Sequence, residues 1–186
     1  MILAIDYDGT IADSNAEKMK WIRDHLNRDI PVWLCNKTDC VPLIGEAVYT
    51  EMGDCVYERE STLRAPAVPG ALAALTTLAA TNELHVVTAR PPRRLAFAME
   101  WLTRNDIIQL FRGIHSSHER AKSTICCSIG AHLLVDDDTR HLDKRDCPGL
   151  SRILLQCGRD APPEAPEGVR FLKDWPAVVA SIEDMA

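Results

Sequence analysis

Short apolar runs alternate along the chain with longer segments in which apolar residues recur at helical spacing. The apolar runs fall at residues 2–5, 84–88, 131–135 and 151–156, with weaker ones at 111–116 and 169–172. The helical segments fall at residues 14–26, 71–80, 93–105, 122–129 and 175–182. Runs of branched aliphatic residues suit strands that are buried on both faces of a parallel sheet. Strands alternating with helices predict an α/β fold with a doubly wound, mostly parallel sheet.

The alternation is interrupted between residues 27 and 69. This stretch contains four prolines, several cysteines and acidic patches, and its pattern predicts only a short helix around residues 44–51. It has no apolar strand followed by a long helix, so we do not expect it to add a unit to the sheet. Together with the helix at 14–26, it predicts a small, mainly helical cap at residues 14–68, inserted after the first strand. The core would then consist of residues 1–13 and 69–186.

The composition of the 186 residues is that of an ordinary globular protein, with 46% hydrophobic and 26% charged residues. The formal net charge of −6 argues against a non-specific nucleic-acid binder. No apolar run approaches the roughly 18 residues that span a bilayer, and the first residues do not have the pattern of a secretory signal. We therefore expect a cytoplasmic protein without a membrane partner.

Two carboxylates directly follow the first predicted strand, in the segment Asp6-Tyr7-Asp8-Gly9-Thr10. In parallel sheets, ligands bind beyond the carboxyl ends of the strands. Asp6 and Asp8 would therefore offer a reactive carboxylate, a second carboxylate close by, and oxygen ligands for a hard cation such as Mg²⁺. The alternative is an acidic turn at a strand end, because Asp-Gly is a common turn pair.

Polar side chains also follow the later strands. Thr88 ends the second strand, Lys122 comes after the third, and Asp136 and Asp137 end the fourth. Each has a plain alternative, since Thr88 could be an ordinary strand residue, Lys122 a surface lysine, and the acidic pair a solvated turn. Because all of them follow apolar strands, we expect them to converge with the carboxylates of the first strand at one crevice.

The order and spacing of these groups resemble the haloacid dehalogenase-like superfamily, from Met1 to about Asp143. The first motif of that superfamily, an apolar strand followed by Asp-x-Asp-x-Thr, is matched by residues 5–10. The second motif, a strand ending in Ser or Thr, is matched by Thr88. The third and fourth motifs, a lysine at or before a helix and a strand ending in an acidic pair, are matched by Lys122 and by residues 136–137.

The resemblance implies a Mg²⁺-dependent phosphomonoester hydrolase. Asp6 would be the nucleophile that forms an aspartyl-phosphate, and Asp8 would protonate the leaving oxygen and then activate water. The carboxylate of Asp6, the backbone carbonyl of Asp8 and the carboxylate of Asp137 would hold Mg²⁺, with Asp136 behind them.

The remaining motif residues would bind the substrate. Thr88 and Lys122 would bind the non-bridging phosphate oxygens, and Thr10 would add a hydroxyl or fix the loop. Arg90, Arg93 and Arg94 would suit an anionic substrate, with a solvated helix start as the alternative. Dehalogenases and phosphonate hydrolases of the superfamily lack an acid at the position of Asp8, so the resemblance favours a phosphatase or phosphotransferase.

The substrate is implied only as a small phosphorylated metabolite. Residues 87–91 and the acidic end of the fourth strand, with a short cap, look like the 5′(3′)-deoxyribonucleotidase branch, although the cap sequence contains no motif of that branch. Four aromatic residues of the predicted cap could stack on a base or sugar or be buried aromatic residues, namely Trp21, Trp33, Tyr49 and Tyr57. A sugar-phosphate phosphatase is an alternative, and so is a nucleic-acid 3′-end phosphatase, which the negative net charge disfavours.

Two alternatives lie outside this class of enzyme. A phosphatase-like binding or regulatory protein would keep the fold with little turnover. A receiver-type signalling domain also uses acidic residues, a hydroxyl and a lysine around Mg²⁺, but in a different order along the chain. Here an acidic pair follows Lys122, which disfavours the receiver.

Overall fold

A computed structural model describes residues 1–143, 147–161 and 164–185 of the chain. Within these residues, six strands form one sheet with all neighbours parallel, in the order β3-β2-β1-β4-β5-β6. The strands are β1 (Ile2–Ile5), β2 (Glu83–Thr88), β3 (Phe111–Ser116), β4 (Leu133–Asp136), β5 (Ser151–Leu155) and β6 (Val169–Leu172). The α/β fold predicted from the sequence is confirmed.

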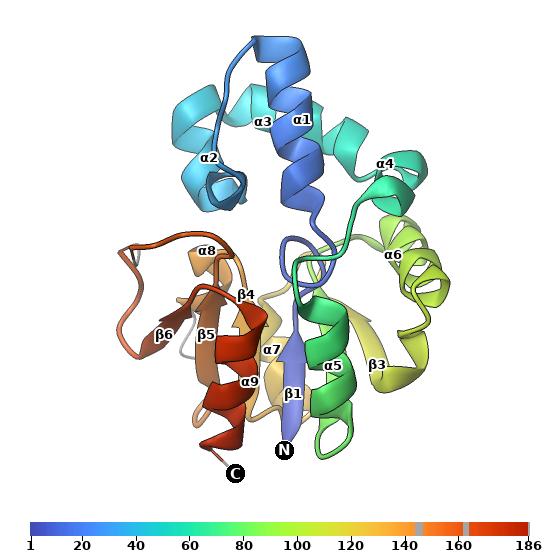
Figure 1. Ribbon diagram of the computed structural model, residues 1–186, viewed down its shortest axis with the longest axis vertical. Helices are drawn as coiled ribbons and strands as arrows, with labels where there is room; N and C mark the ends of the chain where they lie inside the picture. Colours follow the sequence, from blue (N-terminus) through green and yellow to red (C-terminus); the bar gives the residue numbers. More distant parts are fainter. Residues whose placement is uncertain (144–146, 162–163, 186) are drawn as a thin grey trace.

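Helices cover both faces of the sheet (Figure 1). One face carries α5 (Ala71–Ala79), α6 (Pro92–Arg104) and α9 (Trp175–Glu183), and the other carries α7 (Lys122–Ser128) and α8 (Thr139–Leu142). A short 3₁₀ helix, Ile108–Leu110, precedes β3. Because successive strand residues point to opposite faces, Leu3 and Ile5 pack with the first set of helices and Ala4 packs with the second.

Residues 14–64, which we call the helical segment, lie over the carboxyl ends of the strands (Figure 1). They contain α1 (Ser14–Leu26), a 3₁₀ helix (Val32–Leu34), α2 (Lys37–Ile44), α3 (Glu46–Val56) and α4 (Arg59–Arg64). Residues such as Ile22 and Met52 are fully buried in a hydrophobic cluster within this segment. The division of the chain into a cap at 14–68 and a core stays a prediction.

The short helix predicted at residues 44–51 is wrong in its bounds. Ile44 ends α2, and Gly45, with φ of 86°, separates it from α3. The sequence did not predict α2 because Pro42 lies inside it, and proline removes a backbone donor and strains a helix interior. The side chain of Asn36 starts this helix by accepting a hydrogen bond from the backbone N–H of Asp39 at 3.0 Å.

The strand order brings the motif residues together. β1 lies between β2 and β4, and the chain proceeds outward from β1 in both directions across the sheet. Such a reversal of strand order is where ligands bind in doubly wound sheets. The backbone N–H of Asp6 donates to the carbonyl of Val135 at 2.9 Å, so the ladder between β1 and β4 continues to the first motif residue.

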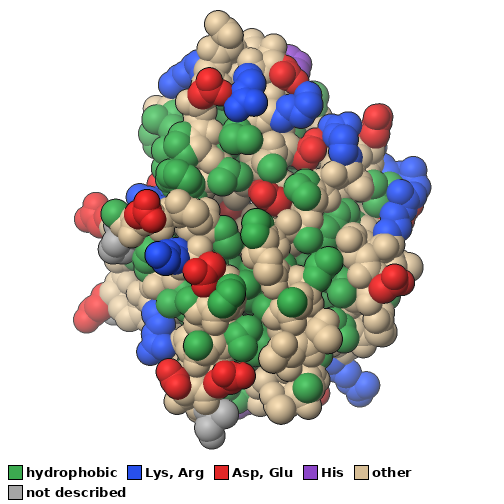
Figure 2. Space-filling model, in the orientation of Figure 1, with side chains coloured by type: hydrophobic (Ala, Val, Ile, Leu, Met, Phe, Trp, Pro, Cys, Tyr) green, Lys and Arg blue, Asp and Glu red, His purple; other side chains and the backbone are tan. Residues whose placement is uncertain are grey.

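Two further features are the distribution of charge on the surface and the length and polarity of the helices. On the face shown in Figure 2, acidic and basic side chains are interspersed over the helical segment rather than segregated by sign. None of the described helices is long and apolar enough to cross a lipid bilayer.

Candidate active site

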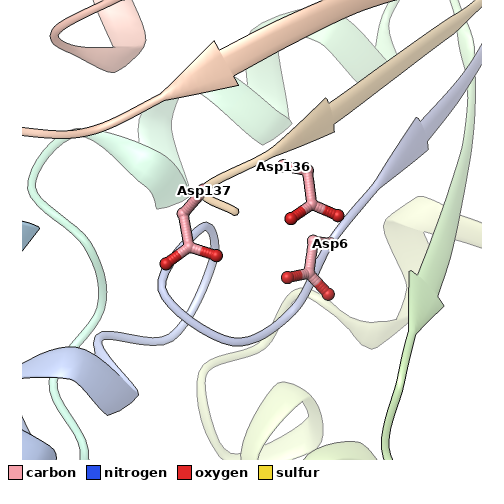
Figure 3. Close-up of side chains that lie close together, drawn as sticks. All are labelled: Asp6, Asp136 and Asp137. Carbon is pink, nitrogen blue, oxygen red and sulfur yellow. The ribbon is translucent and has the colours of Figure 1, made fainter. Parts of the chain in front are cut away.

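Three buried carboxylates meet at the carboxyl ends of β1 and β4 (Figure 3). One oxygen from each of Asp6, Asp136 and Asp137 lies within 4.8 Å of the other two. Asp6 directly follows β1, Asp136 is the last residue of β4, and Asp137 begins the next loop. Oxygen ligands at this separation suit a hard divalent cation. The structure therefore brings together three of the four residues that the sequence predicted to hold Mg²⁺.

Lys122 lies between two of these carboxylates, Asp6 and Asp136. Its ammonium nitrogen is 2.7 Å from Oδ1 of Asp6 and 2.6 Å from Oδ2 of Asp136. The side chain is 1% exposed, so the alternative of a surface lysine is wrong. Although burial alone would lower the pKa of Lys122, the two carboxylates raise it above its ordinary value. Lys122 is therefore a fixed positive charge at neutral pH.

The carboxylates themselves are hard to ionise in the absence of a cation. Burial raises the pKa of Asp6 to about 7, with further contributions from Asp136 and Asp8, while Lys122 opposes the shift. Burial and the charges of Asp136 and Asp6 also raise the pKa of Asp137 well above its usual range. A divalent cation would relieve this repulsion, so the electrostatics of the residues present fit a metal site.

The loop after β1 approaches Asp137 very closely at Gly9. Gly9 has a φ of 74°, and a Cβ built there would lie 2.2 Å from Oδ2 of Asp137. That oxygen also accepts a hydrogen bond from Nδ2 of Asn15 at 2.6 Å. Glycine is thus required both by the left-handed conformation and by the space left for the carboxylate.

Asp8 is held in a bidentate ion pair. Nε and Nη2 of Arg90 donate to Oδ2 and Oδ1 of Asp8, both at 2.8 Å, and Nη1 of Arg90 donates to Thr62 at 2.8 Å. Burial alone would raise the pKa of Asp8, but Arg90 lowers it below the ordinary value. Arg90, predicted to bind substrate, is therefore paired with the predicted acid–base group in this structure.

The two predicted threonines lie in different surroundings. Thr88 is fully buried, ends β2 and lines the same cavity as Asp6 and Lys122. Its Oγ1 accepts a hydrogen bond from the backbone N–H of Arg90 at 3.2 Å. Thr10 is also fully buried but is not among the residues lining the cavity. Its backbone carbonyl accepts a hydrogen bond from the indole of Trp175 at 3.0 Å, which ties the motif loop to α9.

A cavity of about 240 Å³ lies above these groups. Its walls come from the strand ends and from the helical segment. The described residues that line it are Asp6, Asp8, Lys18, Asn36, Lys37, Tyr49, Tyr57, Thr88, Ala89, Arg90, Pro91, Arg94, Lys122, Asp137, Asp138, Arg140 and His141.

Several of these residues were not predicted from the sequence. Lys18 is only 3% exposed and accompanies Asn15 on one face of α1, an i,i+3 spacing directly after the Asp-x-Asp motif that could have indicated them. Asp138 is also buried, and it accepts hydrogen bonds from the backbone N–H groups of Lys37 and Arg140. No signal in the sequence pairs Asp138 with α2, because about a hundred residues separate them.

Comparisons with known proteins place this fold. No protein-family model matches the chain, and no curated protein matches its sequence. Among solved structures, a haloacid dehalogenase-like hydrolase from Streptococcus pneumoniae matches with a TM-score of 0.65 and 13% identity, covering 97% of each chain. A HAD family hydrolase from Deinococcus radiodurans with bound phosphate and sodium matches at 0.60 and 11%, covering 98% of this chain and 95% of the other.

A third match has the same architecture. The HAD-type hydrolase YfnB from Bacillus subtilis, bound to magnesium, has a TM-score of 0.62 and 13% identity, with 97% of each chain covered. The chain therefore has the fold of the haloacid dehalogenase-like hydrolases, and the family resemblance of its motifs is confirmed at the level of the fold.

Replacing Gly9 by alanine should remove metal binding, because the new methyl group would displace the carboxylate of Asp137. Gly149→Ala is the matched control, since Gly149 has a φ of 81° but nothing within 4 Å of its Cβ position. Both variants should lose roughly 1 to 2 kcal/mol of folding stability from the left-handed conformation. Only Gly9→Ala should lose Mg²⁺ affinity in calorimetric titration; equal affinity in both variants would contradict the geometry.

Mg²⁺ should raise the melting temperature more at pH 8 than at pH 5. Because the pKa of Asp6 is raised to about 7, the metal-free protein loses stability as the pH rises from about 4 towards 7. A cation offsets the ionised carboxylates at pH 8, whereas at pH 5 it competes with protons. Asp137→Asn should abolish the response, and exposed Asp184→Asn should retain it. The same Mg²⁺-induced shift at both pH values would contradict this account.

Replacing Arg90 by methionine should raise the pKa of Asp8, because the partner that stabilises its charge is removed. The expected shift is about one pH unit or more. It can be measured from the pH dependence of the Asp8 carboxyl ¹³C signal. Exposed Arg93, which pairs with Glu58, supplies the control Arg93→Met. An unchanged Asp8 titration in Arg90→Met would show that the ion pair is not formed in solution.

Proposed function

We propose that the protein is a Mg²⁺-dependent phosphomonoester hydrolase that acts on a small phosphorylated metabolite through an aspartyl-phosphate. The observation that carries this proposal is the buried cluster of Asp6, Asp136 and Asp137, in which Lys122 pairs with Asp6 and Asp136 beside the cavity. Asp8 lies two residues from Asp6 and lines the same cavity. The cluster combines a nucleophile, a cation site and a fixed positive charge in one place.

The metal site would use the carboxylates of Asp6 and Asp137. Asp136 is committed to Lys122 through one oxygen and to the backbone N–H of Asp138 through the other, so it would orient the site from behind. When bound, the cation would offset the repulsion between a carboxylate nucleophile and an anionic phosphate ester. The backbone carbonyl of Asp8 is a further ligand implied by the family resemblance.

Asp6 would attack phosphorus through a carboxylate oxygen. The new bond joins Asp6 to phosphorus, the bond from phosphorus to the ester oxygen breaks, and the leaving oxygen takes a proton from Asp8. In the second step Asp8 would take a proton from water as the water oxygen bonds to phosphorus, and the bond from phosphorus to Asp6 would break, which releases phosphate and restores the Asp6 carboxylate. Lys122, with its ammonium beside Asp6, and Thr88 would bind the non-bridging oxygens of the phosphoryl group.

The ion pair between Arg90 and Asp8 affects the role of Asp8 as the proton donor. An ionised carboxylate cannot donate a proton, and Arg90 favours the ionised form. An incoming phosphate ester offers oxygens that compete with Asp8 for the guanidinium. In this proposal the guanidinium of Arg90 exchanges its hydrogen bonds with Asp8 for hydrogen bonds with the substrate. The pKa of Asp8 then rises when the leaving group needs a proton. This reconciles the predicted role of Arg90 in substrate binding with its observed partner.

The cavity favours a small substrate. Its volume of about 240 Å³ is below the roughly 300–1,000 Å³ of typical sites for drug-sized ligands. A compact sugar phosphate or phosphorylated acid suits this volume better than a nucleotide does. A phosphatase-like binding protein is the second candidate, and turnover separates it from an enzyme.

Asp6→Asn should reduce phosphate release from 4-nitrophenyl phosphate roughly 1,000-fold or more in the presence of Mg²⁺, because the amide is a poor nucleophile. The variant should keep the circular dichroism spectrum of the native protein. Exposed Asp24→Asn, on α1, should retain full activity. Near-normal turnover in Asp6→Asn would eliminate Asp6 as nucleophile. If the native protein releases neither phosphate from any ester nor halide from a haloacid, the binding-protein candidate is favoured.

A further inference from the structure

The two sides of the cavity differ in charge. All four acidic residues of the lining, Asp6, Asp8, Asp137 and Asp138, come from the strand ends. Among the described residues, the helical segment contributes only neutral or cationic side chains to the lining, namely Lys18, Asn36, Lys37, Tyr49 and Tyr57. The side of the cavity opposite the carboxylates therefore suits a ligand that carries negative charge.

Lys18 is the distinctive group on that side. Its side chain is nearly fully buried, and Nζ donates to Oδ1 of Asn15 at 2.9 Å. Nζ also lies 5.7 Å from the ring centroid of Tyr49 and 5.4 Å from that of Tyr57. Two phenol rings and one amide oxygen thus surround the ammonium group, and the cation–π contacts stabilise its charge only in part.

The other cavity cations in the described part of the chain all have a carboxylate partner at ion-pair distance, whereas Lys18 has none. The pairs are Lys122 with Asp6, Arg90 with Asp8, Arg140 with Asp138, Lys37 with Glu46, and Arg94 with Asp54. Asp137 and Asp8 also stabilise the charge of Lys18, but from beyond ion-pair distance, and a buried charge without a close counter-charge is costly. A ligand with its own negative charge would supply the missing partner.

We propose that Lys18 binds a second acidic group, a carboxylate or a second phosphate, in the leaving part of the substrate. The proposal rests on the proposed function, because it assigns the phosphoryl group to Asp6, Lys122 and Thr88 at the floor of the cavity. Lys18 on α1, with Tyr49 and Tyr57, then faces the leaving group of the phosphate ester. The substrate class is accordingly a small phosphomonoester of a hydroxy acid or a small bisphosphate, rather than a neutral sugar phosphate.

The test compares matched esters with and without the second acidic group. One pair is 3-phosphoglycerate and glycerol 3-phosphate, and ethylene glycol bisphosphate distinguishes a second phosphate from a carboxylate. The native protein should favour the acidic ester in kcat/KM by roughly tenfold or more, the size expected of a charge-assisted hydrogen bond. Lys18→Met should bring this ratio close to one, mainly through KM, with Lys18→Gln as a second neutral variant. Lys20→Met, at an exposed position of α1, should keep the native ratio.

A purely structural role for Lys18 gives a different result. Lys18 contacts Asn15, and Asn15 contacts Asp137, so Lys18 could act only by positioning a metal ligand. In that case Lys18→Met would raise the Mg²⁺ concentration needed for half-maximal activity and leave the acidic-to-neutral ratio unchanged. That outcome, or a native protein that does not discriminate between the esters, would overturn the proposal.

Binding measurements separate this proposal from the proposed function. Asp6→Asn and the double variant Asp6→Asn/Lys18→Met can be titrated calorimetrically with 3-phosphoglycerate and glycerol 3-phosphate. Preferential binding of the acidic ester that is lost in the double variant would support the role of Lys18 even if the native protein hydrolysed nothing. Equal affinity for the two esters in Asp6→Asn would overturn it, whatever the turnover.

Discussion

The site depends on the burial of Lys122 between Asp6 and Asp136. Lys122 contacts two of the three buried carboxylates, Asp6 and Asp136, whereas Lys18 acts on the third, Asp137, from beyond ion-pair distance. Removing one partner from a buried ion pair costs about 3 to 5 kcal/mol, so each of these residues constrains the others. Burial is the main reason that the pKa values of Asp6 and Asp137 are raised, the neighbouring carboxylates add to the shift, and a divalent cation would favour the ionised forms. The backbone supports this arrangement by placing the ends of β1 and β4 side by side.

The helical segment is fixed over the cavity by polar contacts made at its edges. Asp138 accepts from the backbone N–H of Lys37 at the start of α2, and Gln156 donates to Asp39 at 3.3 Å. On the opposite side, Arg94 pairs with Asp54 and Glu58 at 3.1 and 3.3 Å. The segment has its own hydrophobic cluster, and Leu63 of α4 also packs against the hydrophobic core beside α6. Charged groups that are buried at this cavity, such as Asp6 and Lys122, interact more strongly than they would in bulk water.

The sequence predicted the core more accurately than the helical segment. The strands at Ile2–Ile5 and 84–88 were predicted almost to their observed bounds. Short runs of branched aliphatic residues are typical of strands that are buried on both faces of a parallel sheet. By contrast, α2 was missed because its proline contradicts the local rule, and α4 was missed because its stability comes from packing on α6 and from the pair between Arg64 and Glu17. The bounds of short helices of this kind are set by tertiary contacts, which a single sequence does not display.

What the sequence by itself determined is the type of fold and the chemistry of the strand ends. Apolar runs that end in Asp6, Thr88 and Asp136 specify a parallel sheet whose polar groups meet at one edge, because parallel strands share their carboxyl ends. Only the tertiary structure decided which charges pair. It paired Arg90 with Asp8, placed the ammonium group of Lys18 near the rings of Tyr49 and Tyr57 with no described carboxylate at ion-pair distance, and left Thr10 out of the cavity lining. Electrostatic interactions depend on distance and burial, and residues far apart in the chain acquire both only when it folds.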